Sequence, residues 1–213
     1  MKSEEIKVKS NGQGMEDALV LTENTARNAG IDGKNLLRMR LLAEELIGMM
    51  RGITDSVEAL YTVEITGEKK FALHLKSDVN MKREMYDQLI AVSSSGKNSA
   101  TKGFMGKIRE MITVALLPKE SGISFMSGFS MGLMSTAGAA APNAQMIAAE
   151  SFEWSLSQYR TSVERGLAAG GSDSGEAKNA WDELEKSIVA SIADEVKVSV
   201  VGSSAEIVIF KAF

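Results

Sequence analysis

Two charged residues on one long helical stretch, Arg38 and Glu45, are candidates for a functional site because of their types and their positions on the helix. Residues 35–51 read NLLRMRLLAEELIGMMR, and successive residues of a helix lie about 100° apart. This spacing places Arg38 and Glu45 at the edge of an apolar face, where the burial of an unpaired carboxylate costs several kcal/mol of folding free energy. The other charged residues are expected opposite, in solvent: Arg40, Glu44 and Arg51. We therefore expect Glu45 either to face a site or to pair with Arg38 at the edge of a packed helix.

The segments around this helix predict the elements that hold it. Residues 3–10 alternate, with Ile6 and Val8 on one face, and predict a first strand. A helix is expected over residues 15–28, and Gly30 follows it in the position of a left-handed cap. The helix over 35–51 would then pack into the core through its apolar face: Leu36, Met39, Leu42, Ala43, Leu46, Ile47, Met49 and Met50.

Two β-rich runs follow and predict a hairpin. They cover residues 56–66 and 71–77, and the segment 67–70 between them has the length of a four-residue hairpin loop. One face of the second run holds Phe71, Leu73 and Leu75, and the other holds Ala72, His74 and Lys76. The sheet is therefore expected to be covered on one side and wetter on the other. His74 belongs to the wetter face, and we assign it no chemistry.

The second half of the chain predicts further helices and a closing hairpin. Helical spacing marks residues 81–92, 103–116 and 150–167, and a further helix that carries Trp181, Leu184, Ile188 and Ile192. The aromatic residues of these helices are expected to be core anchors. Residues 168–176, AAGGSDSGE, predict a flexible surface connection. The closing hairpin has strands over 195–201 and 205–213.

These elements predict an α+β fold in a single domain over residues 1–213. We expect a two-layer sandwich, in which a mixed, mainly antiparallel sheet carries its helices on one face. Residues 119–150 are expected to form an insertion rich in Gly, Ala, Ser and Met. No charged residue occurs from Ser121 to Ala149, but polar residues interrupt every apolar run before it reaches about 18 residues. The stretch therefore predicts a buried or mobile insertion, either a lid or a self-association surface, and not a membrane span.

Composition excludes several classes of function. The chain has 24 basic and 28 acidic residues and a net charge of −4, so it lacks the basic footprint of a nucleic-acid-binding protein. It has no cysteine, which excludes disulfides, thiolate catalysis and cysteine metal sites. With His74 as the single histidine, a site that needs two imidazoles from one chain is also excluded. The N-terminal MKSEEIKVKS has no apolar core, so we expect no signal peptide and a cytoplasmic protein.

The order strand, helix, helix, hairpin and then helices, together with ARNAGIDGKNLLRMRLLAEELIGMM, resembles a known family. The stretch is similar to the opening of the histidine-kinase-type ATPase domains, the GHKL superfamily with the Bergerat fold. Within that superfamily it is most similar to the small anti-sigma-factor serine kinases, and it also looks like uncharacterised predicted ATP-binding proteins of Firmicutes. The resemblance covers roughly residues 1–115 and implies ATP as the cofactor.

In this family the glutamate of the helix activates water or the accepting hydroxyl, and an asparagine four residues later binds Mg²⁺. Glu45 matches the glutamate and would be the base of an active enzyme. Met49 stands where the asparagine should be. Mg²⁺ takes oxygen ligands, and a thioether cannot replace an amide carbonyl. The resemblance therefore names no metal ligand in this chain, and it favours a protein that is not an enzyme.

After the hairpin the family has a DxGxG motif that reads adenine. Asp78 matches the aspartate, whereas Asn80 and Lys82 replace both glycines. Asn80 tolerates a positive φ better than a bulkier residue would. An adenine pocket that includes Asp78 and Asn80 would therefore need a different shape.

A third stretch resembles the glycine-containing lid of the family. Residues 93–98, SSSGKN, precede 102–107, KGFMGK, which leads into a predicted helix. Free N–H groups at a helix N-terminus favour an anion, so the lid residues that would contact phosphate are Lys97, Lys102, Gly103 and Gly106. The spacing is not that of a Walker loop. An ordinary polar loop with its lysines in solvent explains the same residues.

Two classes of function follow from these motifs. The first is a regulatory protein on a GHKL scaffold that has lost catalysis and acts by contact with an unidentified protein partner. The second is a working ATP-binding protein, such as an anti-sigma-like serine kinase or ATPase, with Glu45 as base, Asp78 on adenine and the lysines on phosphate. Met49 and the lost glycines favour the first class. A homo-oligomer or ligand-sensing surface formed by residues 121–149 is a third alternative.

Overall fold

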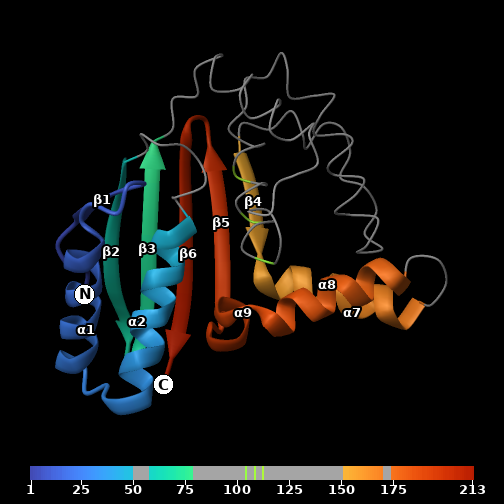
Figure 1. Ribbon diagram of the computed structural model, residues 1–213, viewed down its shortest axis with the longest axis horizontal. Helices are drawn as coiled ribbons and strands as arrows, with labels where there is room; N and C mark the ends of the chain where they lie inside the picture. The colour runs from blue at the N-terminus through green and yellow to red at the C-terminus, as the bar shows by residue number, and fades with distance from the viewer. Residues whose placement is uncertain (50–57, 79–103, 105–107, 109–111, 113–150, 170–173) are drawn as a thin grey trace.

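The fold is α+β and is built on one antiparallel sheet (Figure 1). The computed structural model describes residues 1–49, 58–78, 104, 108, 112, 151–169 and 174–213. In this part of the chain the sheet has six strands in the order β1-β2-β3-β6-β5-β4. The two hairpins lie far apart in the sequence, yet they join in one sheet because β3 pairs with β6. The expected α+β class is therefore confirmed.

The strands agree with the predicted hairpins. They are β1 (Ile6–Lys9), β2 (Glu58–Gly67), β3 (Lys70–Asp78), β4 (Ser151–Ser155), β5 (Glu195–Val201) and β6 (Ser204–Ala212), and each pairing is antiparallel. Only Glu68 and Lys69 separate β2 from β3, so the turn is tighter than the four-residue loop expected. A bulge at the end of β2 accompanies this turn.

The first two helices lie close to the predicted ranges 15–28 and 35–51, of which residues 50 and 51 fall outside the described part of the chain. They are α1 (Met15–Asn28) and α2 (Gly33–Gly48). Gly30 ends α1 with φ of 76°. Its N–H bonds the carbonyl of Arg27, and the N–H of Ile31 bonds that of Ala26, which is the Schellman pattern. The predicted left-handed cap is confirmed.

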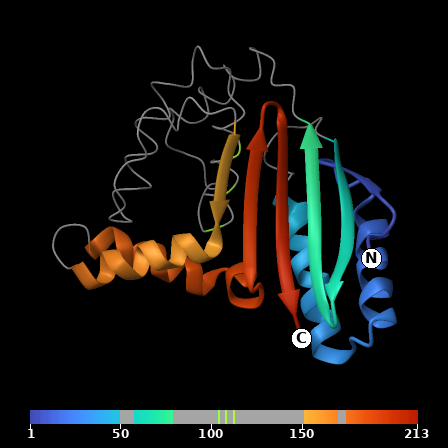
Figure 2. The ribbon, with the colours of Figure 1, turned by 180° about the vertical axis from the view of Figure 1, so that it is seen from behind.

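The sheet has one covered face and one open face. α1 and α2 lie against the first of these (Figure 1), and Figure 2 shows the opposite face, which we call the open face. Alternate strand residues fill the core under the helices: Tyr61, Val63, Phe71, Leu73, Leu75, Val196, Val198, Ile207 and Ile209. The open face carries His74 and Lys76, as expected. Thr62 and Ala72 on this face are nevertheless buried, because longer charged side chains can cover short neighbours.

The structure corrects the helix predicted over residues 150–167. Residues Ser151–Ser155 form β4, and α7 (Leu156–Ala169) begins only after it. Local spacing allowed one continuous helix, but β4 pairs with β5 along five residues, from Ser151 opposite Val201 to Ser155 opposite Lys197. Cross-strand pairing, which the local pattern does not record, decides the conformation here.

The last predicted helix is two helices. α8 (Ser174–Lys186) ends before Ser187, and α9 (Ile188–Ile192) follows. The Ser187 hydroxyl accepts a hydrogen bond from the N–H of Ala190 at 3.2 Å, so this serine caps α9 and marks the break. α7 and α8 also take in both ends of the connection expected over 168–176.

Several expectations fall on residues outside the described ranges. They include the helix over 81–92, most of the helix over 103–116, the insertion over 119–150, Met50, Arg51 and residues 170–173. Phe104, Ile108 and Ile112 are described: each is helical and buried in the core, as their spacing predicted. No helix of the described part is both long enough and apolar enough to cross a membrane.

Candidate functional site

Glu45 lies near the end of α2, on the flank that faces away from α1. Arg40, about 140° away around the helix, pairs with α1, and this identifies the flank of Glu45. The Glu45 side chain is half-buried, and within the described residues its carboxylate has no hydrogen-bond or ion-pair partner. Arg38 donates from Nη1 to Oδ1 of Asn35 at 3.2 Å. The alternative in which Glu45 pairs with Arg38 is therefore not observed.

Arg40 is not the solvated charge that its position predicted. Its Nη1 donates to Oε1 of Glu23 at 2.5 Å, and its Nη2 lies 3.6 Å from Oε2 of Glu16. Arg27 donates to the second oxygen of Glu23 at 3.0 Å. The hydrogen bond from Arg40 holds the pKa of Glu23 below its ordinary value. The pairs of Arg40 with Glu23 and Glu16 join α2 to α1, and helix spacing within α2 alone could not reveal them.

Met49 is part of the hydrophobic core. Its side chain is 1% exposed and packs in the same cluster as Leu46 and Leu42. The position four residues after Glu45 therefore presents a thioether to the core and offers no oxygen ligand. Among the described residues, no group of three or more His, Asp or Glu side chains could hold a metal ion.

Asp78 is the last residue of β3, and its side chain belongs to the face of the sheet opposite α2. It pairs in register with Ser204 of β6 and is exposed. Because alternate residues of a strand point to opposite faces, Asp78 shares the open face with Lys76 and His74. The C-terminal end of α2 and the end of β3 lie toward the same end of the sheet (Figure 1). The structure nevertheless does not bring Asp78 and Glu45 onto one face.

The remaining candidate residues lie outside the described part of the chain: Asn80, Lys97, Lys102, Gly103 and Gly106. Phe104, which lies between Gly103 and Gly106 in the sequence, is among the described residues. Phe104 packs in an aromatic cluster with Trp154 of β4 and Tyr159 of α7, and the three ring centroids are 5.9–6.1 Å apart. Phe104 therefore packs against the strand and the helix that follow the expected insertion.

A cluster of ionisable side chains that sequence analysis missed lies on the open face. Nδ1 of His74 lies 3.0 Å from Oε1 of Glu206 on β6, and Nε2 lies 3.4 Å from Oε2 of Glu64 on β2. The side chains are 20%, 38% and 39% exposed, in that order. Nε2 is buried, and it has no hydrogen-bond partner within the described residues. Strand alternation signals that the three share a face, but the pairing of β3 with β6 was not predicted.

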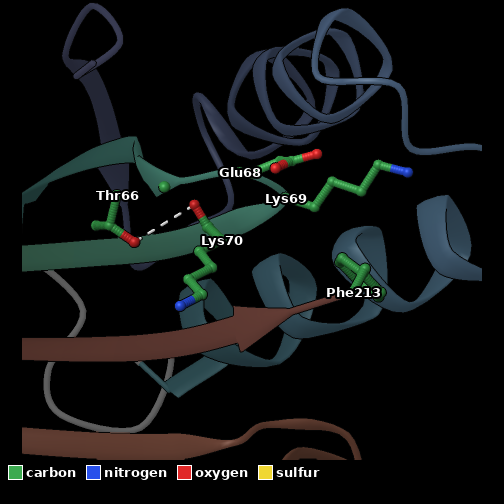
Figure 3. A pocket seen from close by; sticks show the side chains of 6 residues that line it. Thr66, Glu68, Lys69, Lys70 and Phe213 are labelled. Atoms are coloured by element: carbon green, nitrogen blue, oxygen red, sulfur yellow. Dashed lines mark hydrogen bonds between the residues drawn. The ribbon is translucent and has the colours of Figure 1, made fainter.

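An open depression of about 500 Å³ lies at the turn between β2 and β3. Thr66, Lys69, Lys70 and Phe213 are among the residues that line it (Figure 3). Thr66 donates to the carbonyl of Lys70 at 3.4 Å, while the side chains of Lys69 and Lys70 leave the turn in different directions (Figure 3). The depression gathers no convergent set of charges, and it lies at the end of the sheet where α2 begins (Figure 1).

In comparisons with known proteins, no family model, no curated protein and no solved structure matches the chain. The resemblance to the GHKL superfamily, and the roles that it implies for Glu45 and Asp78, therefore stay predictions from the sequence.

Proposed function

We propose that this chain is a cytoplasmic regulatory protein on a GHKL-type, ATP-binding scaffold whose nucleotide motifs have degenerated. It acts by contact with a protein partner and not by catalysis. The observation that carries the proposal is the burial of Met49. The residue four positions after Glu45, which in the family would ligate Mg²⁺, is a core thioether here.

The arrangement of elements supports the scaffold. A strand and two helices precede a hairpin, and the terminal hairpin completes the same sheet. α2, which carries Glu45, packs against α1, β3, β6 and α9. The helix that would hold the catalytic residues therefore lies over the middle of the sheet.

The position of Asp78 supports the loss of the nucleotide site. In the proposed ancestor an aspartate after the hairpin reads adenine in the same pocket as the helix glutamate. Here Asp78 pairs in register with Ser204 and lies on the open face, whereas α2 covers the other face. A nucleotide held by both residues would need β3 to end before Asp78.

Calorimetry on the purified chain tests the proposal. We expect no Mg²⁺-dependent heat of binding when ATP or ADP is titrated, each with and without Mg²⁺, because the metal position offers no oxygen. The same titrations on Glu45→Gln should give the same result. Tight Mg²⁺-dependent binding of ATP, or release of phosphate from it, would contradict the proposal.

The second candidate is a working serine kinase or ATPase, favoured by one observation. The Glu45 carboxylate is half-buried and has no partner within the described residues, as a general base that awaits its substrate would be. Under this alternative, Glu45→Gln abolishes phosphoryl transfer. Glu44→Gln is the matched control, because Glu44 is the adjacent glutamate and is exposed. Equal activity of both variants and the unmodified chain would eliminate Glu45 as the base.

A further inference from the structure

The outer face of α2 carries two leucines and two charged residues in one stripe. Leu37 is 57% exposed, Leu41 is half-buried, and Lys34 and Glu44 are exposed. These residues follow one another at intervals of three, four and three positions, which places them in a line along the helix. α1 and α2 lie in front of the sheet in Figure 1, so the stripe belongs to the surface of the helical layer that faces away from the sheet.

The stripe is symmetric about Met39. Lys34 and Glu44 stand at equal distances in sequence before and after this residue, and so do Leu37 and Leu41. When two copies of such a helix pack antiparallel about this centre, Lys34 of each copy faces Glu44 of the other, and Leu37 faces Leu41. Helices whose contact residues are spaced by three and four positions pack side by side in this way. The face is therefore complementary to itself in charge and in apolar side chains.

The two charges of the stripe are not used within the described part of the chain. Neither Lys34 nor Glu44 forms a hydrogen bond or an ion pair there through its side chain. Lys34 lies in the first turn of α2, where the helix dipole disfavours a cation, and Glu44 lies toward the end that disfavours an anion. An antiparallel second copy would correct both, because its Glu44 would lie near the start of α2 and its Lys34 near the end.

α1 repeats this polarity on the same surface. It begins with Glu16 and Asp17 at the end of the sheet where α2 ends, and it finishes with Arg27 near the start of α2 (Figure 1). The side chain of Arg27 stays 55% exposed beside Glu23, and Val20, in the middle of α1, is 46% exposed. One end of the helical layer is therefore acidic and the other end is basic. A two-fold axis that crosses the helices at right angles brings opposite ends together, whereas an axis parallel to them would bring like ends together.

We propose that the outer face of α1 and α2 binds a second copy of this chain in a two-fold symmetric dimer, with the two α2 helices antiparallel. α1 has 14 residues and α2 has 16, so the helices are about 21 and 24 Å long. At a width of about 10 Å for each helix, the face covers roughly 450 Å² per copy and the dimer buries about 900 Å² in total, the size of a weak, transient interface. The dimer therefore forms in a concentration-dependent way. This inference goes beyond the proposed regulatory function and requires neither a nucleotide nor another protein.

Sedimentation velocity on a dilution series of the full chain, at low ionic strength, tests the dimer. We expect the unmodified chain to pass from monomer to dimer as its concentration rises. Lys34→Glu and Glu44→Lys should each raise the dissociation constant by roughly tenfold or more, because each places two pairs of like charges in the symmetric interface. An unmodified chain that stays monomeric throughout the series would overturn the proposal, and so would a dimer that neither variant weakens.

An equimolar mixture of Lys34→Glu and Glu44→Lys provides the sharpest test. In a mixed dimer both charge pairs are opposite again, so the mixture should dimerise about as tightly as the unmodified chain although each variant alone does not. Lys178→Glu is the matched control: it makes the same change of charge at an exposed position of α8, and it should leave the dissociation constant unchanged. Far-UV circular dichroism confirms that each variant is folded. A mixture of folded variants that stays monomeric, or an equal loss of dimer in Lys178→Glu, would refute the assigned surface.

Discussion

Gly14 is where we expect a single added methyl group to destabilise the fold most clearly. It precedes α1 with φ of 80°, and its neighbour across the junction is β1. A Cβ atom built on Gly14 would lie 2.1 Å from the carbonyl oxygen of Lys7 and 3.1 Å from its carbonyl carbon. Both contacts are with backbone, so no side-chain rotation can relieve them. Gly14→Ala must move β1 away from α1.

Two terms set the size of the effect. An L-residue in the left-handed region costs about 1–2 kcal/mol, and a shift of packed backbone costs about 1–3 kcal/mol more. Gly14→Ala should therefore lower the free energy of unfolding by about 2–5 kcal/mol. Gly30→Ala is the matched control, because Gly30 has φ of 76° and a Cβ added there would meet no atom within 4 Å. It should lose only the first of these terms.

Urea unfolding followed by far-UV circular dichroism measures both variants against the unmodified chain. The difference between Gly14→Ala and Gly30→Ala isolates the contact with Lys7, because the strain from positive φ is common to both. Equal losses in the two variants would refute the reasoning. So would a Gly14→Ala protein as stable as the unmodified chain, since β1 would then not lie against Gly14 as described.

Three further predictions concern stability. Lys69 has φ of 51° in the turn between β2 and β3, so Lys69→Gly should stabilise by about 0.5–1 kcal/mol; a lower melting temperature would contradict this. Arg40→Gln should lower the free energy of unfolding at neutral pH. Because Arg40 lowers the pKa of Glu23 from 4.5, the difference in unfolding free energy from the unmodified chain should shrink as the pH falls below that value. A difference in urea unfolding that does not change with pH would contradict the pairing. Thr22 and Tyr61 share a buried hydrogen bond of 2.6 Å, so Thr22→Val should lower the free energy of unfolding by about 1–3 kcal/mol. In a Tyr61→Phe background the same substitution should cost much less. Additive losses in urea unfolding would refute the coupling.

Much of the N-terminal half could be predicted because its signals are local. α1 was predicted with its observed bounds, since apolar spacing and the cap at Gly30 act within a few residues of one another. The hairpin of β2 and β3 was predicted for the same reason, and so was the placement of His74 on the open face. Only the length of the turn was wrong, because the bulge at the end of β2 depends on the register of the pair.

The errors arose where distant pairing decides the conformation. The residues of β4 fit a helical spacing together with Leu156, but they form a strand because they pair with β5, about 40 residues later in the chain. Arg40 was assigned to solvent, since its partner Glu23 lies on another helix. Glu206 could not be assigned to His74 for the same reason. The residues next to Arg40 and Glu206 in the sequence carry no information about these contacts.

The candidate site shows how strongly strand register limits chemistry. The flank of α2 was predicted well enough to place Glu45 at a half-buried edge, and the end of β3 was predicted within one residue. Yet each step of one residue along β3 changes the face to which a side chain points. Because Asp78 pairs with Ser204, it belongs with Lys76 and His74, and Glu45 lies across the sheet. A pocket that used both carboxylates would require Asp78 to leave its pairing with Ser204 of β6. That change would also disturb the neighbouring Ser77, whose hydroxyl donates to the Glu58 carbonyl at 2.8 Å.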